Sequence, residues 1–311
     1  MPTAAHKQNS QENLQRLATE SQNEASRELD NKSALEIARL INREDEKVAK
    51  AVRRALPEIA RTIDAVSDAI RKGGRLIYVG AGTSGRIAAL DASEIPPTYN
   101  TDPETVQYVM AGGAKALGSA SEANEDSREL GEADISKRRP TKRDVVVGVA
   151  ASGRTPYTIA AVEFAKSRGA TTVAVTCNAD SLLAQAVDIP IIVEVGPEVI
   201  SGSTRMKAGT AQKLVLNTIS TVTMVKLGKT FGNLMVDVAP TNEKLRSRAR
   251  TAVALATAAP DDAVSAAMTA AEGNAKVAIV SLLAGVDADT ARSRLSAARG
   301  VIREAVADVV G

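Results

Sequence analysis

The stretch Arg75-Leu-Ile-Tyr-Val-Gly-Ala-Gly-Thr-Ser-Gly-Arg86, which leads to Asp91-Ala-Ser-Glu-Ile-Pro-Pro97, decides the fold. Its apolar run 76–79 has the length of a strand and predicts a buried one. The glycines that follow allow a ligand to come close to the backbone. Free N–H groups at the start of the next helix favour an anion such as a phosphate. A strand, a glycine-rich turn, a helix and a glutamate together suggest an enzyme that acts on a phosphorylated small molecule.

The composition is that of a globular protein with an aliphatic core. The chain has 311 residues, of which 44% are hydrophobic and 24% charged, enough for one large domain or two smaller ones. Aromatic residues make up only 2% and Trp is absent, so no aromatic platform for stacked bases is available. The net charge of +2, with both signs interspersed, argues against a nucleic-acid partner.

Cysteine and histidine are too scarce for several kinds of site. The chain has one Cys (Cys177) and one His (His6), which excludes an internal disulfide and a zinc site of the usual Cys/His type. We expect no metal and no cofactor. The start of the sequence lacks the apolar core of a signal peptide, and no apolar run reaches the roughly 18 residues of a membrane span. We therefore expect a cytoplasmic protein with no membrane partner.

The order of the expected elements indicates three parts. Residues 1–32 are polar and are expected to be mobile or to lie over another surface. Residues 33–235 begin with helices, and Ser33 and Glu36 match a capping box. Strands expected at 106–111, 144–150, 171–176 and 189–195 then alternate with helices, which predicts a doubly wound α/β fold, a parallel sheet with helices on both faces. Residues 236–311 are Ala-rich and predict a small all-helical subdomain.

Three Gly/Ser/Thr-rich segments, each before an expected helix, are candidates for binding one phosphate. We call them the first loop (80–86), the second loop (151–156) and the third loop (201–205). The first loop has the spacing G-x-G-x-x-G, but no clear acidic residue ends the next strand and no Gly-Lys-Ser/Thr follows, so neither a dinucleotide nor a Walker site is indicated. Together the loops favour a phosphosugar, with candidate contacts at Thr83, Ser84, Gly85, Ser152, Gly153, Thr155, Ser201, Ser203 and Thr204.

Several carboxylates are candidates for acid–base chemistry. Glu94 precedes two prolines that we expect to fix the exit of the chain and hold its carboxylate still. Glu122 and Glu125 lie in an expected acidic helix, and the residues alone favour an exposed helix face there. Glu198, next to the third loop, is a further candidate. Cys177 is expected to serve packing, because no histidine is available to activate it.

The residues resemble the N-acetylmuramic acid 6-phosphate etherases, a family built on the sugar isomerase (SIS) domain. The resemblance covers nearly the whole chain and rests on strings in the family's order. They are Gly80-Ala-Gly-Thr-Ser-Gly-Arg86, Asp91-Ala-Ser-Glu-Ile-Pro-Pro-Thr98, Ala111-Gly-Gly113, Gly196-Pro-Glu-Val199, Gly202-Ser-Thr-Arg-Met-Lys-Ala-Gly-Thr-Ala-Gln212 and Asn233-Leu-Met-Val-Asp237, with Thr19-Glu20, Asn23 and Ile41-Asn-Arg-Glu-Asp45 upstream. Small departures occur, among them Gln22 where Arg is expected.

The resemblance implies a lyase-type reaction without a metal. The family converts N-acetylmuramic acid 6-phosphate and water into N-acetylglucosamine 6-phosphate and D-lactate. By motif position its proton donor falls on Glu94 and its second essential glutamate on Glu125, which reverses the surface interpretation of that residue. The phosphate contacts fall on Ser and Thr of the three loops. Because SIS proteins usually dimerise, we also expect a homodimer.

Two other functions share the phosphate contacts. A ketose/aldose phosphate isomerase on the same fold commonly uses a histidine for ring opening, and the only histidine here, His6, lies outside the expected fold. A non-catalytic sugar-phosphate sensor, like the glucokinase regulatory protein, need not keep both glutamates. The residues leave open which glutamate takes the C2 proton.

Overall fold

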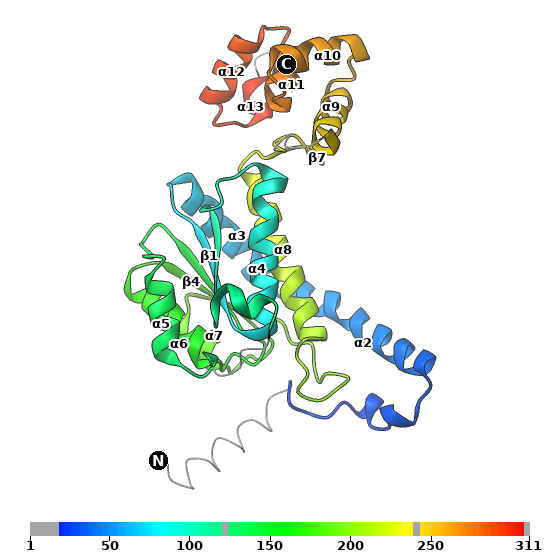
Figure 1. Cartoon of the computed structure of the whole chain (residues 1–311), viewed down its shortest axis with the longest axis vertical. Helices are drawn as coiled ribbons and strands as arrows, with labels where there is room; N and C mark the ends of the chain where they lie inside the picture. Colours follow the sequence, from blue (N-terminus) through cyan, green and yellow to red (C-terminus); the bar gives the residue numbers. More distant parts are fainter. Residues whose placement is uncertain (1–18, 120–123, 239–242, 308–311) are drawn as a thin grey trace. The chain divides into compact units, whose positions relative to one another are not determined.

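A five-stranded parallel sheet forms the centre of the larger part of the chain (Figure 1). The computed structural model describes residues 19–119, 124–238 and 243–307. The strands lie in the order β2-β1-β3-β4-β5, with β1 at Leu76–Gly80, β2 at Val106–Met110, β3 at Val145–Val149, β4 at Thr171–Thr176 and β5 at Ile189–Ile192. Every residue of β1 and β3 is buried, as expected for central strands that helices cover on both faces. The predicted parallel sheet is therefore confirmed.

Helices cover both faces of this sheet. One face carries α5 (Arg128–Ser136), α6 (Pro156–Ser167) and α7 (Leu182–Ala186), and α5 and α6 pack on each other. The side chains of Ile77, Ile135 and Tyr157 are fully buried between them and the sheet. The other helices of this part are α2 (Ala34–Arg54), α3 (Leu56–Arg71), α4 (Gly82–Tyr99) and α8 (Lys207–Lys226), of which α3 packs on β1, β3 and β5. Figure 1 shows α3, α4 and α8 on the side of the sheet away from α5 and α6.

The helix ends follow the local sequence. Ser33 and Glu36 form the predicted capping box at the start of α2, and Pro57 lies in the first turn of α3. Pro96 and Pro97 were expected to fix the exit of the chain after Glu94, but both lie inside α4. They bring it to an end within one turn, and Asn100 follows with a left-handed φ of 48°.

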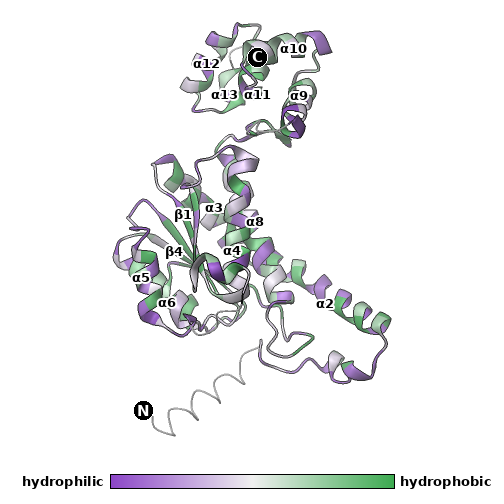
Figure 2. Cartoon of the chain, in the orientation of Figure 1, coloured by the Kyte–Doolittle hydropathy of each residue, from purple (hydrophilic) through white to green (hydrophobic). Residues whose placement is uncertain are grey.

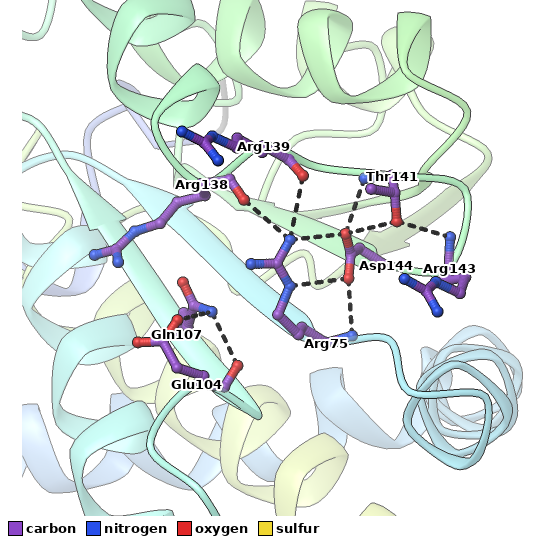
Figure 3. A network of polar contacts seen from close by, with 8 residues as sticks. All are labelled: Arg75, Glu104, Gln107, Arg138, Arg139, Thr141, Arg143 and Asp144. Carbon is purple, nitrogen blue, oxygen red and sulfur yellow. Dashed lines mark hydrogen bonds and ion pairs between the residues drawn. The ribbon is translucent and has the colours of Figure 1, made fainter.

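Hydrogen bonds around Asp144 tie the amino ends of β1 and β3 together (Figure 3). The carboxylate of Asp144, just before β3, accepts hydrogen bonds from the backbone N–H of Arg75 at 2.9 Å and from its guanidinium at 3.0 and 3.1 Å. It also accepts from the N–H and hydroxyl of Thr141 at 2.8 and 3.1 Å. Burial opposes ionisation, but these hydrogen bonds outweigh it and hold the pKa of Asp144 below its usual value.

The chain divides into two compact units. The first ends at Ser93 and resumes over Glu104–Ser220, and the second contains Glu94–Pro103 and the chain from Thr221 onward. The division therefore runs through α4 and α8, and the boundary expected at 235/236 stays a prediction. The second unit holds the short hairpin β6 (Thr230–Phe231) and β7 (Leu234–Met235) and the helices α9 (Glu243–Thr257), α10 (Asp261–Ala270), α11 (Ala275–Ala284), α12 (Ala288–Ala297) and α13 (Ile302–Ala305).

The second unit has an apolar core of its own, and its chain from Glu243 to Ala305 forms helices, as the Ala-rich pattern predicted. Val253, Ile279 and Val280 are fully buried in this core. Figure 2 shows hydrophobic segments along α11 and hydrophilic ones along α9, which is the expected distribution for one buried and one partly exposed helix. In the ranges that the structure describes, no helix is both long and apolar enough to cross a membrane.

Candidate functional site

The first and second loops leave neighbouring strands at the same edge of the sheet. Gly80, the last residue of β1, pairs with Val149, the last residue of β3. From β1 the chain proceeds to β2 on one side, whereas β3 lies on the other side, so the strand order reverses between β1 and β3. Ligands of open α/β sheets bind at such a switch point, beyond the carboxyl ends of the strands.

The glycines of the first loop allow α4 to start directly against β1. A Cβ atom at Gly85 would lie 2.9 Å from the carbonyl oxygen of Gly80 and 2.7 Å from the Cγ of Met110. Gly85 is thus needed for packing, whatever it does for a ligand. The side chains of Thr83 and Ser84, half-buried and buried, lie in the first turn of α4, where N–H groups have no partner within the helix.

The second loop presents the start of α6. Thr155 is the N-cap residue of α6, yet its hydroxyl accepts no hydrogen bond from that helix's own N–H groups. The Ser152 hydroxyl accepts from the N–H of Arg154 at 3.3 Å. A Cβ at Gly153, where φ is +65°, would lie 2.4 Å from the Oγ and Cβ of Ser181. Gly153 therefore allows the loop to pack closely on the start of α7.

The third loop adjoins the first. A Cβ atom at Gly209, in the first turn of α8, would lie 3.6 Å from the Cγ2 of Thr83, so the starts of α8 and α4 are in contact. The carbonyl of Thr204 accepts from the N–H of Gly209 at 3.0 Å. Ser203 and Thr204 are half-buried, and Ser201 is exposed. The expected phosphate contacts thus come from three loops of one compact unit.

An N-terminal strap, residues 19–26, holds the chain before and within the third loop. The carbonyl of Thr19 accepts from the N–H of Gly202 at 3.3 Å, and Thr19 is buried. The Ser26 hydroxyl donates to the carbonyl of Val199 at 2.8 Å, and the Asn23 amide donates to that of Pro197 at 3.3 Å. The sequence predicted a polar segment that could lie over another surface but did not indicate which surface. His6 lies outside the described residues.

Glu198 caps a helix. Its carboxylate is fully buried and accepts from the N–H groups of Lys207 and Ala208 at 3.0 and 2.9 Å. Burial raises its pKa, and these hydrogen bonds oppose that shift. The ammonium of Lys207 in turn contacts the carboxylate of Glu44 on α2 at 2.6 Å, with both side chains buried. These contacts fix the first turn of α8, directly after the third loop.

Glu125 lies next to the first loop. The sequence predicted that Glu125 lies in an acidic helix. In the structure the Ser127 hydroxyl caps α5, so this helix begins at Arg128, and Glu125 lies in the turn before it. Its carbonyl accepts from the N–H of Tyr157 on α6 at 3.1 Å. Its Oε1 lies 2.8 Å from where a Cβ at Gly82 would be. The neighbouring candidate, Glu122, lies outside the described residues.

Glu94 lies further along α4. It is exposed and comes twelve residues after Gly82. With a rise of 1.5 Å per residue, that spacing corresponds to roughly 18 Å along the helix axis. Glu94 is therefore not placed beside the first loop by its own helix.

A buried carboxylate that the sequence analysis did not single out lies one turn before Glu94. Asp91 accepts hydrogen bonds from the Tyr78 hydroxyl at 2.8 Å, the Asn217 amide at 2.5 Å and the Ser220 hydroxyl at 2.9 Å. Burial, and then the nearby Asp91 charge, raise the pKa of Tyr78 well above its usual value. The network ties α4 to β1 and α8. Asp91 belongs to the string Asp91-Ala-Ser-Glu94 that carries the resemblance, but the residue pattern did not indicate that its carboxylate is buried.

The described residues offer little for metal or thiol chemistry. Among residues 19–119, 124–238 and 243–307, no group of three or more His, Cys, Asp or Glu side chains could hold a metal ion. Cys177 is buried, and burial raises the pKa of its thiol to about 12. The thiolate is thus suppressed at neutral pH, which agrees with the packing role that we expected.

Comparisons with known proteins connect this arrangement to named relatives. Residues 129–222 match the SIS domain family, and residues 58–166 match the family described as the glucokinase regulatory protein N-terminal SIS domain. The N-acetylmuramic acid 6-phosphate etherase of Streptomyces avermitilis is 53% identical over 307 residues, 99% of each chain. That of Streptomyces coelicolor is 52% identical over the full length of both chains, and that of Symbiobacterium thermophilum 58% identical over 88% of this chain and 91% of the relative.

Proposed function

The chain belongs to the N-acetylmuramic acid 6-phosphate etherase family, and from this premise we propose that it converts N-acetylmuramic acid 6-phosphate and water into N-acetylglucosamine 6-phosphate and D-lactate. The position of the Glu125 carboxylate beside Gly82, at the start of α4, is the observation that carries the proposal. A carboxylate that can transfer a proton thus lies beside the first loop, which we expect to hold the phosphate. The isomerase and sensor alternatives are not favoured, because these relatives are named etherases.

The proposed reaction is an elimination followed by an addition. The lactyl ether at C3 is a poor leaving group on a closed sugar ring. Ring opening gives an aldehyde at C1, which acidifies the proton at C2. Removal of that proton and protonation of the ether oxygen release lactate and leave a C2–C3 double bond, to which water then adds at C3. These two steps need at least one acid and one base, each of which raises the rate by about 10²- to 10⁴-fold.

We assign the base to Glu125 and the acid to Glu94. Glu125 lies against the start of α4, close to the loops that would hold the phosphate, and its backbone is fixed by Tyr157. Glu94 is exposed and would donate a proton to the departing lactate. Thr83, Ser84, Ser152 and Thr155 would bind the phosphate with the N–H groups at the starts of α4 and α6. Gly85, Gly153, Ser201, Ser203 and Thr204 would complete the walls of the site.

The spacing along α4 favours a homodimer with a shared site. Glu94 lies roughly 18 Å along the helix from Gly82, beside which the Glu125 carboxylate lies. C2 and C3 of one sugar are bonded neighbours, so one subunit cannot bring both glutamates to them by α4 alone. We therefore propose that Glu94 of a second copy completes each site. The reaction needs no metal or cofactor in this scheme, and we expect the enzyme to work in the cytoplasm.

One assay tests the proposed activity. The purified protein is incubated with N-acetylmuramic acid 6-phosphate, and D-lactate is measured. We expect lactate from the native chain and a fall of at least about 10²-fold for Glu94→Gln and for Glu125→Gln. Folded native protein that releases no lactate would refute the activity. If both variants kept the native rate, the activity would stand and the roles of the two glutamates would be wrong.

Mixing the two variants tests the shared site. In a heterodimer of Glu94→Gln and Glu125→Gln subunits, one site would contain two native glutamates and the other none. Co-expressed, differently tagged subunits should therefore recover a substantial fraction of the native rate, although each variant alone is inactive. A heterodimer as inactive as its parents would place both glutamates in the same subunit's site. Light scattering on the eluting peak gives the oligomeric state directly.

A further inference from the structure

The carboxylate of Glu125 lies where a side chain at Gly82 would be. The φ of Gly82 is +52°, so a glycine is favoured there for the backbone alone. At Gly113, Gly196, Gly232 and Gly285 the backbone is also left-handed, but a Cβ atom would meet nothing within 4 Å. At Gly82 it would lie 2.8 Å from Oε1, 3.7 Å from Cδ and 4.0 Å from Oε2 of Glu125. The space that a side chain would fill is thus occupied by one carboxylate.

We propose that Gly82 is a positioning residue for Glu125: its missing side chain leaves the space in which the carboxylate lies against the start of α4. The inference rests on the proposed function, in which Glu125 takes the C2 proton. Gly82 touches neither substrate nor reacting atoms in this role. It acts through the carboxylate that it admits.

The backbone around Glu125 is held in place, so a side chain added at Gly82 would move the Glu125 carboxylate and not the fold. The carbonyl of Glu125 is held by the N–H of Tyr157 at 3.1 Å, and Ser127 caps α5 two residues later. The atom in the way is the far end of a flexible side chain. A methyl group at residue 82 would therefore push Oε1 outward from 2.8 Å to at least the 3.4 Å of an ordinary contact, with little movement of the chain.

Such a displacement matters for catalysis and much less for binding. A base must lie within hydrogen-bond reach of the proton that it removes, and a misplacement of 1 Å can cost about 10²-fold in rate. The phosphate contacts of the second and third loops do not involve residue 82. The competing explanation, that Gly82 only allows the phosphate to approach the backbone, predicts the opposite pattern: weakened phosphosugar binding and a nearly unchanged kcat.

The experiment compares Gly82→Ala with Gly232→Ala. Gly232 has a similar φ of +56° and open space around it, so its variant carries the same backbone strain without a contact. We expect Gly82→Ala to lower kcat by about 10-fold or more, because the carboxylate must move by at least the 0.6 Å between 2.8 and 3.4 Å. We also expect it to bind N-acetylglucosamine 6-phosphate, measured by calorimetry, within about threefold of the native protein. Gly232→Ala should keep the native kcat. Equal kcat values for the two variants would overturn the inference, as would a loss confined to binding.

A double-mutant cycle tests whether Gly82 acts through Glu125. If both changes remove the same correctly placed carboxylate, Gly82→Ala should add almost nothing to Glu125→Gln. A double variant that is slower than Glu125→Gln by the full single-variant factor would show that Gly82 acts independently, and the inference would fail.

Crystal structures of the native protein and Gly82→Ala separate this inference from the proposed function. A carboxylate displaced at Glu125 with the backbone of α4 unmoved supports the positioning role even if the native protein releases no lactate. An unmoved carboxylate with a shifted α4 overturns it even if lactate is released.

Discussion

Asp144 is an example of a single residue that fixes the register of two strands. Its carboxylate accepts hydrogen bonds from the backbone and guanidinium of Arg75 and from Thr141, while its own backbone leads into β3 (Figure 3). Arg75 also donates to the carbonyl of Arg138 at 2.9 Å, at the end of α5. The ion pair is nearly buried on the Asp144 side, so hydrogen bonds to the ionised form count for more than in a surface pair.

We expect Asp144→Asn to lower the free energy of unfolding by about 1.5–3 kcal/mol at pH 7. Because the pKa of Asp144 is lowered in the folded state, its contribution is fully present above the unfolded pKa of about 3.9 and is lost as pH falls through the folded value. Urea unfolding at pH 7 and below pH 4 should therefore show a difference between native and variant that shrinks in acid.

A control for this prediction is Asp68→Asn, which removes the exposed ion pair with Arg71. Such surface pairs contribute about 0–1 kcal/mol, so this change should be nearly neutral. If Asp144→Asn cost the same at both pH values, the carboxylate charge would not be the source of the stability.

At the level of elements, the start of α8 is held by charges on two sides. Glu198 accepts from its first N–H groups, and Lys207 forms a buried ion pair with Glu44 of α2. A buried ion pair adds little net stability, because both charges lose their hydration, but breaking it leaves one charge without a partner. This arrangement fixes α2 and α8 relative to each other, and with them the third loop.

Lys207→Met should destabilise the protein by about 1–3 kcal/mol, because the Glu44 carboxylate then loses its buried partner and keeps only the ammonium of the exposed Lys47, at 2.5 Å. The double variant Lys207→Met with Glu44→Leu removes both charges and should regain most of that loss. Guanidinium unfolding of the two single variants and the double variant measures the cycle. A double variant no more stable than Lys207→Met alone would contradict this account of the pair.

At the scale of the whole molecule, each of the two compact units has buried apolar residues of its own. Ile191 is fully buried in the sheet of the first, and Ile279 is fully buried among the helices of the second. The candidate phosphate loops and Glu125 all belong to the first unit. Local stability can therefore differ between the units, since each depends on its own buried contacts.

We expect Ile191→Ala and Ile279→Ala each to cost about 2–5 kcal/mol, felt mainly in the unit that contains the change. Hydrogen exchange followed by mass spectrometry reads the two units separately. Ile279→Ala should accelerate exchange in α9–α12 and leave β1, β3 and β4 protected, and Ile191→Ala should do the reverse. Uniform acceleration across both units after either change would mean that they unfold as one.

Much of the fold could be predicted because it depends on local patterns. Apolar runs of strand length, Ser33 with Glu36, and prolines in first turns are readable without contacts, and the strands, α2 and α3 appear where these patterns predict them. The boundaries that differ depend on competition between neighbours. Glu125 lies outside a helix because Ser127 caps α5, and α4 continues through Pro96 to Tyr99.

The sequence by itself determined the alternation of strands and helices, the three loops before helices and the resemblance that carries the two glutamates. Only the tertiary structure decided that Glu125 lies against Gly82, that Glu198 caps α8, and that residues 19–26 cover the chain around the third loop. The physical reason is the separation along the chain over which each kind of interaction acts. Backbone preferences and periodicity act over a few residues, whereas these contacts join residues far apart in the chain, and they form only when the packed sheet brings its loops to one edge.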